Sequence, residues 1–338
     1  MSERYKLLLV DDEENNLALL YRTLRGKYDI VKTTSPVEAM DIMKTEHFDV
    51  ILSDHKMPEI DGVELLKFVY DNFPDTVRIL VTAYSDVSIL IGSINYAKIF
   101  RYIKKPFNPS ELEMVVEAAV EYFQLKRDNE VLISDLKELF SGTINAIIEA
   151  LDAKDSYTLG RSQRVTFYSL KMADKLCVGR AERGKIELAG LLHDIGMIGV
   201  SDDVLTKTEK LTADEFKEIQ SHVEHGIKIL EDIKQLKDVI NIIRYHHEHF
   251  DGNGYPVGLK GEDIPLGSRI IAIADAFDGM LSSRIYRPAM EPEQVIQVLE
   301  NLAGKQFDPN LVSIFKEILP QVLEEIKEFE KSLKIKSN

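Results

Sequence analysis

The feature that most constrains the fold is an alternation of short apolar runs with helical patterns over roughly the first 120 residues. Ser35-Pro36 followed by Glu38, and later Asn108-Pro109, place a capping side chain and a proline where helices begin. Strands that alternate with helices form a parallel sheet covered by helices on both faces. The pattern therefore predicts a doubly wound α/β domain with a five-stranded parallel sheet, its strands at 6–10, 29–32, 49–53, 78–81 and 99–103.

Acidic, hydroxyl and basic side chains follow these predicted strands at the point where each strand ends. Ligands of such sheets bind outside the carboxyl ends of the strands, so these side chains are expected to meet at one edge. Carboxylates held together repel one another unless a divalent cation joins them, and Mg²⁺ suits a site with few carboxylates. A carboxylate beside Mg²⁺ can attack a phosphoryl group and form an aspartyl phosphate. The predicted site consists of Asp11, Asp12, Asp54, Thr82 and Lys105.

Residues 1–122 resemble a response-regulator receiver domain, because LLLVDDE, SDHKMPEIDG, LVTAY and YIKKP occur in the order of that family's motifs. The resemblance implies a sensor histidine kinase as partner and Asp54 as the phosphoacceptor. It implies that Mg²⁺ is held by Asp11, Asp12, Asp54 and the main-chain carbonyl of Lys56. It also implies a phosphorylation switch formed by Thr82, Tyr102 and Lys105, with a cis bond between Lys105 and Pro106.

Residues 123–143 are predicted to form a connector helix, since they contain no proline and only one glycine. Leu125, Leu132 and Leu139 recur every seven residues, with Leu136 offset by four, and this heptad pattern is typical of a coiled coil. One interpretation is an amphipathic helix packed on its own domain. The other is a helix that pairs with its copy in a homodimer. We favour the homodimer, because a phosphorylation signal needs a rigid route to the next domain.

From about residue 144 the pattern is helical almost throughout, and histidines and aspartates lie among apolar residues. Buried polar groups without partners would together cost several kcal/mol, and a metal ion offers them a partner. An aspartate can bridge two ions, and two ions roughly 3.5–4 Å apart suit hydrolysis of a phosphodiester. Histidine with carboxylate fits Fe, Mn, Zn or Ni. The candidate ligands are His193, Asp194, His222, His246, His247 and Asp275.

The motif order HDIG, H-x₃-G, HHEHFDGNGYP and IADAFD is similar to that of the HD-GYP family of cyclic dinucleotide phosphodiesterases. The similarity covers about residues 144–318, within a domain expected to span 144–338. It implies an all-α HD-type helical bundle that hydrolyses cyclic di-GMP at a metal cluster. It also implies that the glycine-rich loop after the paired histidines docks a protein with a GGDEF domain.

The same resemblance assigns roles residue by residue. It implies a catalytic Asp194 that serves both metals, one held with His193 and Asp275, the other with His222, His246 and His247. It implies substrate-binding roles for Tyr255, Arg284 and Arg287, and a supporting role for Asp278.

Two residues depart from the family's pattern. Arg161 stands where a histidine ligand is usual, and Met197 stands where HDIG is usually followed by lysine. Arginine cannot ligate a metal because it carries only hydrogen-bond donors and stays protonated, so the first metal site should be weakened. Tyr157, one helical turn earlier, excludes the extra glutamate ligand of three-metal members. Two functions remain open: a receiver-controlled phosphodiesterase, or a catalytically degenerate domain that binds cyclic di-GMP or a GGDEF protein without hydrolysis.

Charge and composition argue against other classes of protein. A net charge of −15 disfavours sequence-independent binding to nucleic acid, which needs clustered lysine and arginine. The apolar runs are too short to span a membrane, and the N-terminus does not read as a signal peptide. The single cysteine, Cys177, excludes an internal disulfide. We therefore expect a cytoplasmic protein without membrane contact.

Overall fold

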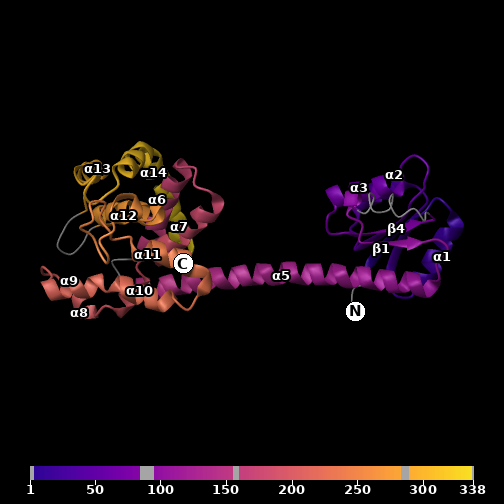
Figure 1. Cartoon of the computed structure of the whole chain (residues 1–338), viewed down its shortest axis with the longest axis horizontal. Coiled ribbons are helices and arrows are strands. Elements are labelled where there is room, and N and C mark those ends of the chain that lie inside the picture. Colours follow the sequence, from indigo (N-terminus) through magenta and orange to yellow (C-terminus); the bar gives the residue numbers. More distant parts are fainter. Residues whose placement is uncertain (1–3, 84–94, 155–159, 283–288, 337–338) are drawn as a thin grey trace. The chain divides into compact units, whose positions relative to one another are not determined.

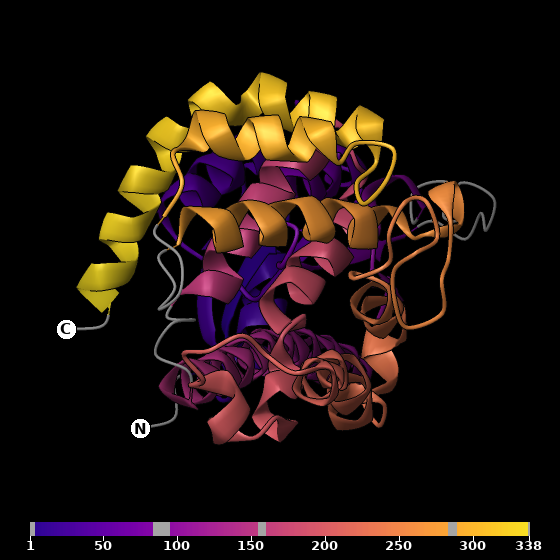
Figure 2. The ribbon, with the colours of Figure 1, turned by 90° about the vertical axis from the view of Figure 1, so that its left-hand side faces the viewer.

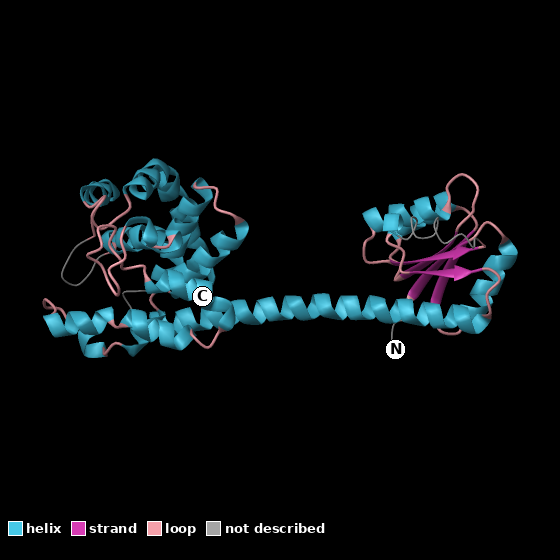
Figure 3. Cartoon of the chain, viewed as in Figure 1, coloured by secondary structure: helices cyan, strands magenta, loops and turns pink. Residues whose placement is uncertain are grey.

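The computed structural model describes residues 4–83, 95–154, 160–282 and 289–336, and Figure 1 labels its helices and strands. Two compact units, Met1–Glu138 and Leu139–Asn338, are treated separately below. The five strands belong to the first unit, and the secondary structure described in the second is helical apart from an isolated bridge (Figure 3). This confirms the predicted fold class, a doubly wound α/β domain followed by an all-α bundle.

The first unit is built on a parallel sheet with the strand order β2-β1-β3-β4-β5. Every neighbouring pair is parallel, so all five carboxyl ends lie at one edge. Since β1 lies between β2 and β3, the strand order reverses beside β1, where sheets of this kind bind ligands. The strands are β1 (Lys6–Val10), β2 (Asp29–Thr33), β3 (Val50–Asp54), β4 (Val77–Thr82) and β5 (Arg101–Lys104). The fifth strand thus begins two residues later than predicted, while Ile99 still packs in the core.

Successive residues of each strand point to opposite faces, and each face carries its own core. Leu7 and Leu9 of β1 pack with α1 (Glu14–Leu24) and the start of α5 (Pro109–Lys154). Leu8 and Val10 pack with α2 (Pro36–Thr45) and α3 (Gly62–Asn72) on the other face. The sheet is therefore covered on both sides, and its carboxyl-end edge is left for a ligand.

Two of the predicted helix starts are confirmed by their hydrogen bonds. The Ser35 side chain accepts a hydrogen bond from the backbone N–H of Glu38, with Pro36 in the first turn of α2. At the start of α5, Asn108 Oδ1 accepts one from the backbone N–H of Glu111 at 2.7 Å. Helix α5 begins in the first unit and continues into the second. Both predicted boundaries, at residues 122 and 143, fall inside it, so the division 1–122, 123–143 and 144–338 stays a prediction.

The second unit packs its helices around one apolar core that includes Phe277 and Phe315. In Figure 2, α13 and α14 lie next to α12, which in turn packs on α6 and α7. Beyond α5, the helices are α6 (Arg161–Lys175), α7 (Arg180–Leu192), α8 (Asp202–Leu205), α9 (Ala213–Gln220), α10 (His222–Leu230), α11 (Lys237–Arg244), α12 (Leu266–Leu281), α13 (Pro292–Asn301) and α14 (Pro309–Lys336). The described part of this unit also contains the 3₁₀ turns η1 (Ile195–Gly199), η2 (Lys234–Leu236) and η3 (Gly261–Asp263).

A capping box begins α9: the Thr212 side chain accepts a hydrogen bond from the Glu215 N–H, and the Glu215 side chain accepts one from the Thr212 N–H. Among the described residues, no helix combines the length and the apolar character that a bilayer crossing requires.

Candidate functional site

Two separate groups of polar residues form the candidate sites. The first lies at the carboxyl-end edge of the sheet, where Asp11 follows β1 and Asp54 ends β3. Oxygens of Asp11, Asp12 and Asp54 lie within 4.8 Å of one another, as ligands of one cation would. Asp11 and Asp54 are buried, and Asp12 is exposed. Burial raises the pKa of Asp54, although Lys105 opposes that rise.

Lys105 joins the two buried carboxylates of this edge. Its ammonium lies 2.8 Å from Asp11 Oδ2 and also forms an ion pair with Asp54. The backbone N–H of Lys56 donates to Asp54 Oδ2 at 3.2 Å, which brings the Lys56 backbone to the same place. The Lys105–Pro106 bond is cis, as predicted. The sequence therefore placed these residues together for a physical reason, the shared edge of a parallel sheet.

Thr82 and Tyr102, the predicted switch residues, differ in exposure. Thr82 is fully buried at the end of β4, and its hydroxyl lies 3.1 Å from Nδ1 of His55. Tyr102 of β5 is exposed. Gly62 at the start of α3 lets this helix pass close to Asp54, because a Cβ there would lie 1.8 Å from the Asp54 carbonyl oxygen.

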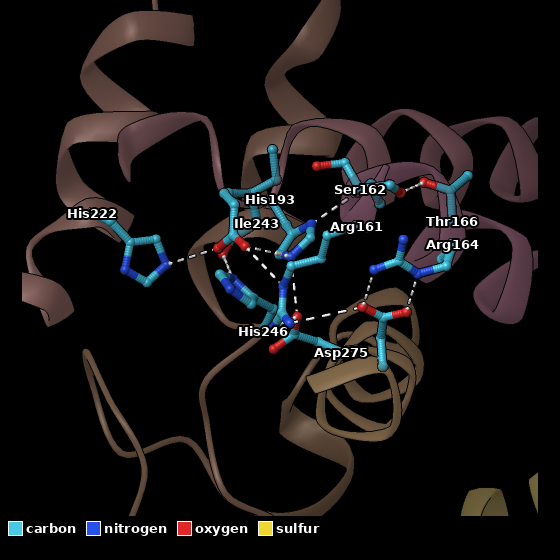
Figure 4. Close-up of polar contacts among 12 residues, drawn as sticks. Arg161, Ser162, Arg164, Thr166, His193, His222, Ile243, His246 and Asp275 are labelled. Atoms are coloured by element: carbon cyan, nitrogen blue, oxygen red, sulfur yellow. Dashed lines mark hydrogen bonds and ion pairs between the residues drawn. The ribbon is translucent and has the colours of Figure 1, made fainter. Parts of the chain in front are cut away.

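The second group lies in the helical unit, where three histidines present Nε2 to a common space (Figure 4). Nδ1 of His193, His222 and His246 each lies within hydrogen-bond distance of a backbone carbonyl, at 2.8, 2.6 and 2.6 Å. A carbonyl can only accept, so each Nδ1 carries a proton. Nε2 of His193 faces two carboxylates, at 3.1 Å from Asp194 Oδ2 and 3.3 Å from Asp275 Oδ1. Nε2 of His222 and His246 is buried and has no hydrogen-bond partner. This is the state in which histidine binds a metal ion.

These side chains fall into two ligand groups. One contains His193, Asp194 and Asp275, and the other contains His222, His246 and His247. Asp194 lies between them: its Oδ2 is 3.1 Å from His193 Nε2, and its Oδ1 is 3.7 Å from His222 Nε2. The sequence assigned the same residues to the same groups, and their roles as ligands remain a prediction.

Burial and charge set the protonation of the two groups differently. Burial keeps the pKa of His246 well below its usual value. Burial is also the main reason why the pKa of His247 falls to about 4. Burial would also lower the pKa of His193, but Asp194 and Asp275 outweigh it and raise this pKa to about 10. Burial opposes ionisation of Asp275, yet Arg161 and His193 hold its pKa well below the usual range. The two rings of His246 and His247 are therefore neutral and can bind a cation.

A close approach of two backbones positions His222. A Cβ on Gly196 of the HDIG motif would lie 1.8 Å from the His222 carbonyl oxygen and 2.4 Å from the Gly226 nitrogen. Only glycine therefore lets η1, which follows Asp194, pack directly on α10. This contact brings Asp194, which follows α7, within 3.7 Å of His222 at the start of α10.

Arg161, the first residue of α6, points into the cluster (Figure 4). Its Nη2 donates to Asp275 Oδ1 at 2.5 Å, its Nε lies 3.5 Å from Asp194 Oδ2, and its Nη1 lies 3.8 Å from Asp278 Oδ2. The arginine that replaces the expected ligand thus contacts the first group's carboxylates. Met197 is half-buried in η1.

The sequence analysis missed two residues that hold this site together. Arg164, one turn after Arg161, donates to both oxygens of Asp278 at 2.7 and 3.0 Å. Glu248 is buried and accepts hydrogen bonds from the backbone N–H groups of Val257 and Gly258. The sequence did offer a signal for Glu248, because it is a charged residue directly after the paired histidines.

The loop that Glu248 holds carries Tyr255, whose ring stacks on His247 with centroids 4.9 Å apart. The Tyr255–Pro256 bond is cis, which the sequence did not predict. Arg284 and Arg287, the predicted phosphate contacts, and Tyr157 lie outside the described residues.

Comparisons with known proteins agree with this geometry. Residues 7–117 match the response regulator receiver domain, and residues 145–311 match the HD domain. The chain is therefore a response regulator that joins an N-terminal receiver domain to a C-terminal HD domain. A receiver domain binds Mg²⁺ and takes its phosphoryl group from a kinase, and an HD domain uses divalent metal ions.

Three relatives share both parts. A cyclic di-GMP phosphodiesterase of Thermotoga maritima is 29% identical, over 94% of this chain and 91% of that protein. The cyclic di-GMP phosphodiesterase response regulator RpfG of Xanthomonas campestris is 29% identical, over 90% and 85%. A probable cyclic di-GMP phosphodiesterase of Vibrio cholerae is 28% identical, over 91% and 76%.

Proposed function

We propose that the protein is a two-component response regulator whose phosphorylation at Asp54 controls a metal-dependent cyclic di-GMP phosphodiesterase. The observation that carries the proposal is the pair of ligand groups that meet at Asp194. Two relatives that align with both the receiver and the HD part, over most of their own length, are named cyclic di-GMP phosphodiesterases. The metal is Fe, Mn, Zn or Ni, because imidazole with carboxylate suits these ions.

Each residue of the site has a separate task in this reaction. His222, His246 and His247 offer ring nitrogens, and Asp194 offers a carboxylate, as ligands. A bound ion would stabilise charge on the scissile phosphate and activate the attacking water. Tyr255 stacks on His247 and lines one side of the space above it.

A turnover assay tests this proposal. The full chain is incubated with cyclic di-GMP and Mn²⁺ or Fe²⁺, and linear pGpG and GMP are separated from the substrate. We expect turnover by the wild type. The turnover rate of His246→Ala should be lower by about 100-fold or more, because this variant lacks one proposed ligand but keeps Arg161 and its contacts. Absence of turnover in both phosphorylated and unphosphorylated wild type would contradict catalysis.

The second candidate is a binding domain that does not hydrolyse cyclic di-GMP or that docks a GGDEF protein. The inward position of Arg161 favours it, since the first ligand group holds a guanidinium and is weakened as a metal site. Calorimetry separates the two candidates. Binding of cyclic di-GMP without turnover would support the second candidate, and binding with turnover would support the first.

Phosphorylation by a sensor histidine kinase at Asp54 is tested with acetyl phosphate, followed by intact-protein mass measurement. Asp54 is buried beside Lys105 and is part of the group within 4.8 Å that suits Mg²⁺. The wild type should gain one phosphoryl group, and Asp54→Asn should gain none. Equal gain by Asp54→Asn would remove Asp54 from this role.

The connector helix is proposed to pair with its copy in a homodimer. Leu125, Leu132, Leu136 and Leu139 of α5 expose 60–67% of their surface, although buried leucine is the norm. They share the heptad spacing of a coiled-coil seam. Light scattering should give twice the chain mass for the full chain and the chain mass for a form without residues 123–141. A full chain that is monomeric at tens of micromolar, with and without phosphorylation, would contradict the dimer.

A further inference from the structure

The guanidinium of Arg161 lies inside the first ligand group. Asp275 Oδ1 accepts a hydrogen bond from Arg161 Nη2 at 2.5 Å and lies 3.3 Å from His193 Nε2. A metal ion in this group would need the same oxygen as a ligand. Asp194 Oδ2 is likewise 3.1 Å from His193 Nε2 and 3.5 Å from Arg161 Nε. A metal ion bound to these atoms at about 2.0–2.2 Å would compete with a fixed cation for the same oxygens.

Arg164 fixes the geometry of that guanidinium from the next helical turn. It pairs with Asp278 through two hydrogen bonds, and Asp278 Oδ2 lies 3.8 Å from Arg161 Nη1. Both arginines come from α6 and both partner aspartates, Asp275 and Asp278, from α12. Arg161 is 12% exposed, and arginine stays protonated, so its charge remains in the cluster.

The carboxylates of the cluster already have cationic partners. Asp194, Asp275 and Asp278 form ion pairs with Arg161 and Arg164. His193 Nε2 also lies 3.1 Å from Asp194 Oδ2 and 3.3 Å from Asp275 Oδ1. A second divalent ion would therefore add positive charge to a buried site whose carboxylates are already paired, which is costly.

The second ligand group has no such competitor among the described residues. Nε2 of His222 and of His246 is buried without a hydrogen-bond partner, and Asp194 Oδ1 faces His222. With His247, these residues supply four ligands, enough for one transition metal.

We propose that the HD centre binds one metal ion per chain, on Asp194, His222, His246 and His247, and that the Arg161 guanidinium takes the place of a second ion. The inference deepens the proposed function, on which it rests for the identity of the centre. Metal content is measured without hydrolysis, so a failure of this inference and a failure of the phosphodiesterase proposal can be told apart.

The test counts Mn²⁺ bound to the full chain after dialysis against trace Mn²⁺ and excess Mg²⁺, which fills the receiver's carboxylates. We expect one Mn²⁺ in the wild type, close to two in Arg161→His, and one in Arg161→Lys, which keeps the charge. Arg183→His adds a histidine at an exposed ion pair on α7 and should also stay at one. Two Mn²⁺ in the wild type or in Arg161→Lys, or one in a folded Arg161→His, would overturn the proposal.

Two further readouts do not depend on Arg161→His folding. Electron paramagnetic resonance of the Mn²⁺-loaded wild type should show an isolated ion, and an exchange-coupled pair would overturn the proposal. His222→Ala should lose the ion from the centre, because it removes one of four ligands. A folded His222→Ala that keeps one tightly bound Mn²⁺ would place that ion in the first group and would overturn the proposal as well.

Discussion

Replacing Gly196 with alanine should displace His222 and weaken the metal centre. The new Cβ would lie 1.8 Å from the His222 carbonyl oxygen, so the two backbones must separate by about 1.2 Å to reach the 3.0 Å that real Cβ contacts respect. Metal sites need their ligands within about 0.5 Å of the productive geometry, which this movement exceeds. Overpacking of this kind costs about 1–3 kcal/mol of unfolding free energy.

The loss of metal binding gives a second signal of comparable size. If the dissociation constant of the metal rises about 100-fold, an ion present at 100 times the wild-type constant stabilises the wild type by about 2.7 kcal/mol and the variant by about 0.4 kcal/mol. Thermal unfolding with and without Mn²⁺ measures this difference directly.

Gly184→Ala is the matched control for this substitution. Gly184 lies inside α7, and a Cβ there would meet nothing within 4 Å. Alanine should therefore raise the unfolding free energy by about 0.5–1 kcal/mol, because glycine is the poorer helix former, and metal binding should not change. A Gly196→Ala protein with wild-type stability and wild-type Mn²⁺ response would refute the reasoning from the close backbone contact.

Three other changes test other parts of the molecule. Lys105→Met should tighten Mg²⁺ binding to the receiver by about tenfold or more, because it removes a cation 2.8 Å from Asp11; weaker binding in a calorimetric titration would contradict this. Leu132→Asp with Leu139→Asp should convert the proposed dimer to a monomer in light scattering. Both leucines are exposed in the single chain and would be buried in the seam of a coiled coil, where aspartate is unfavourable. Glu248→Ala should lower the unfolding free energy by about 3 kcal/mol and speed hydrogen exchange of the two loop amides that it accepts from; unchanged exchange would exclude this anchoring role.

Sequence periodicity predicted the receiver well, since strands buried on both faces read as short apolar runs. The residue that follows each run then lies at the carboxyl-end edge, which is why Asp11, Asp54 and Lys105 were placed together before any contact was known. The hydrogen bond between His55 and Thr82 was not predicted. It depends on the rotation of two side chains, one just after β3 and one at the end of β4, which no pattern along one strand encodes.

In the helical unit, residue type carried more information than periodicity. Histidines and aspartates beside apolar residues indicated ligands. The structure brings them together from the segments just after α7 and α11, from the start of α10 and from α12. Their convergence depends on helix packing, including the glycine contact between η1 and α10. A single sequence shows that residue 196 is glycine, but it does not show which backbone atom would lie 1.8 Å from a Cβ at this position.

The direction of Arg161 was left open by the sequence, yet a signal for it exists in the spacing. Arg161 and Arg164 are three residues apart on α6, and Asp275 and Asp278 are three residues apart on α12, so each pair occupies one helical face. Two arginines and two aspartates at matching spacing can pair only if their faces meet, and α6 does pack on α12. Leaving either pair facing apolar neighbours would bury charge without compensation. The matched spacing therefore favours an inward Arg161, and it makes the arginine part of the site's charge balance.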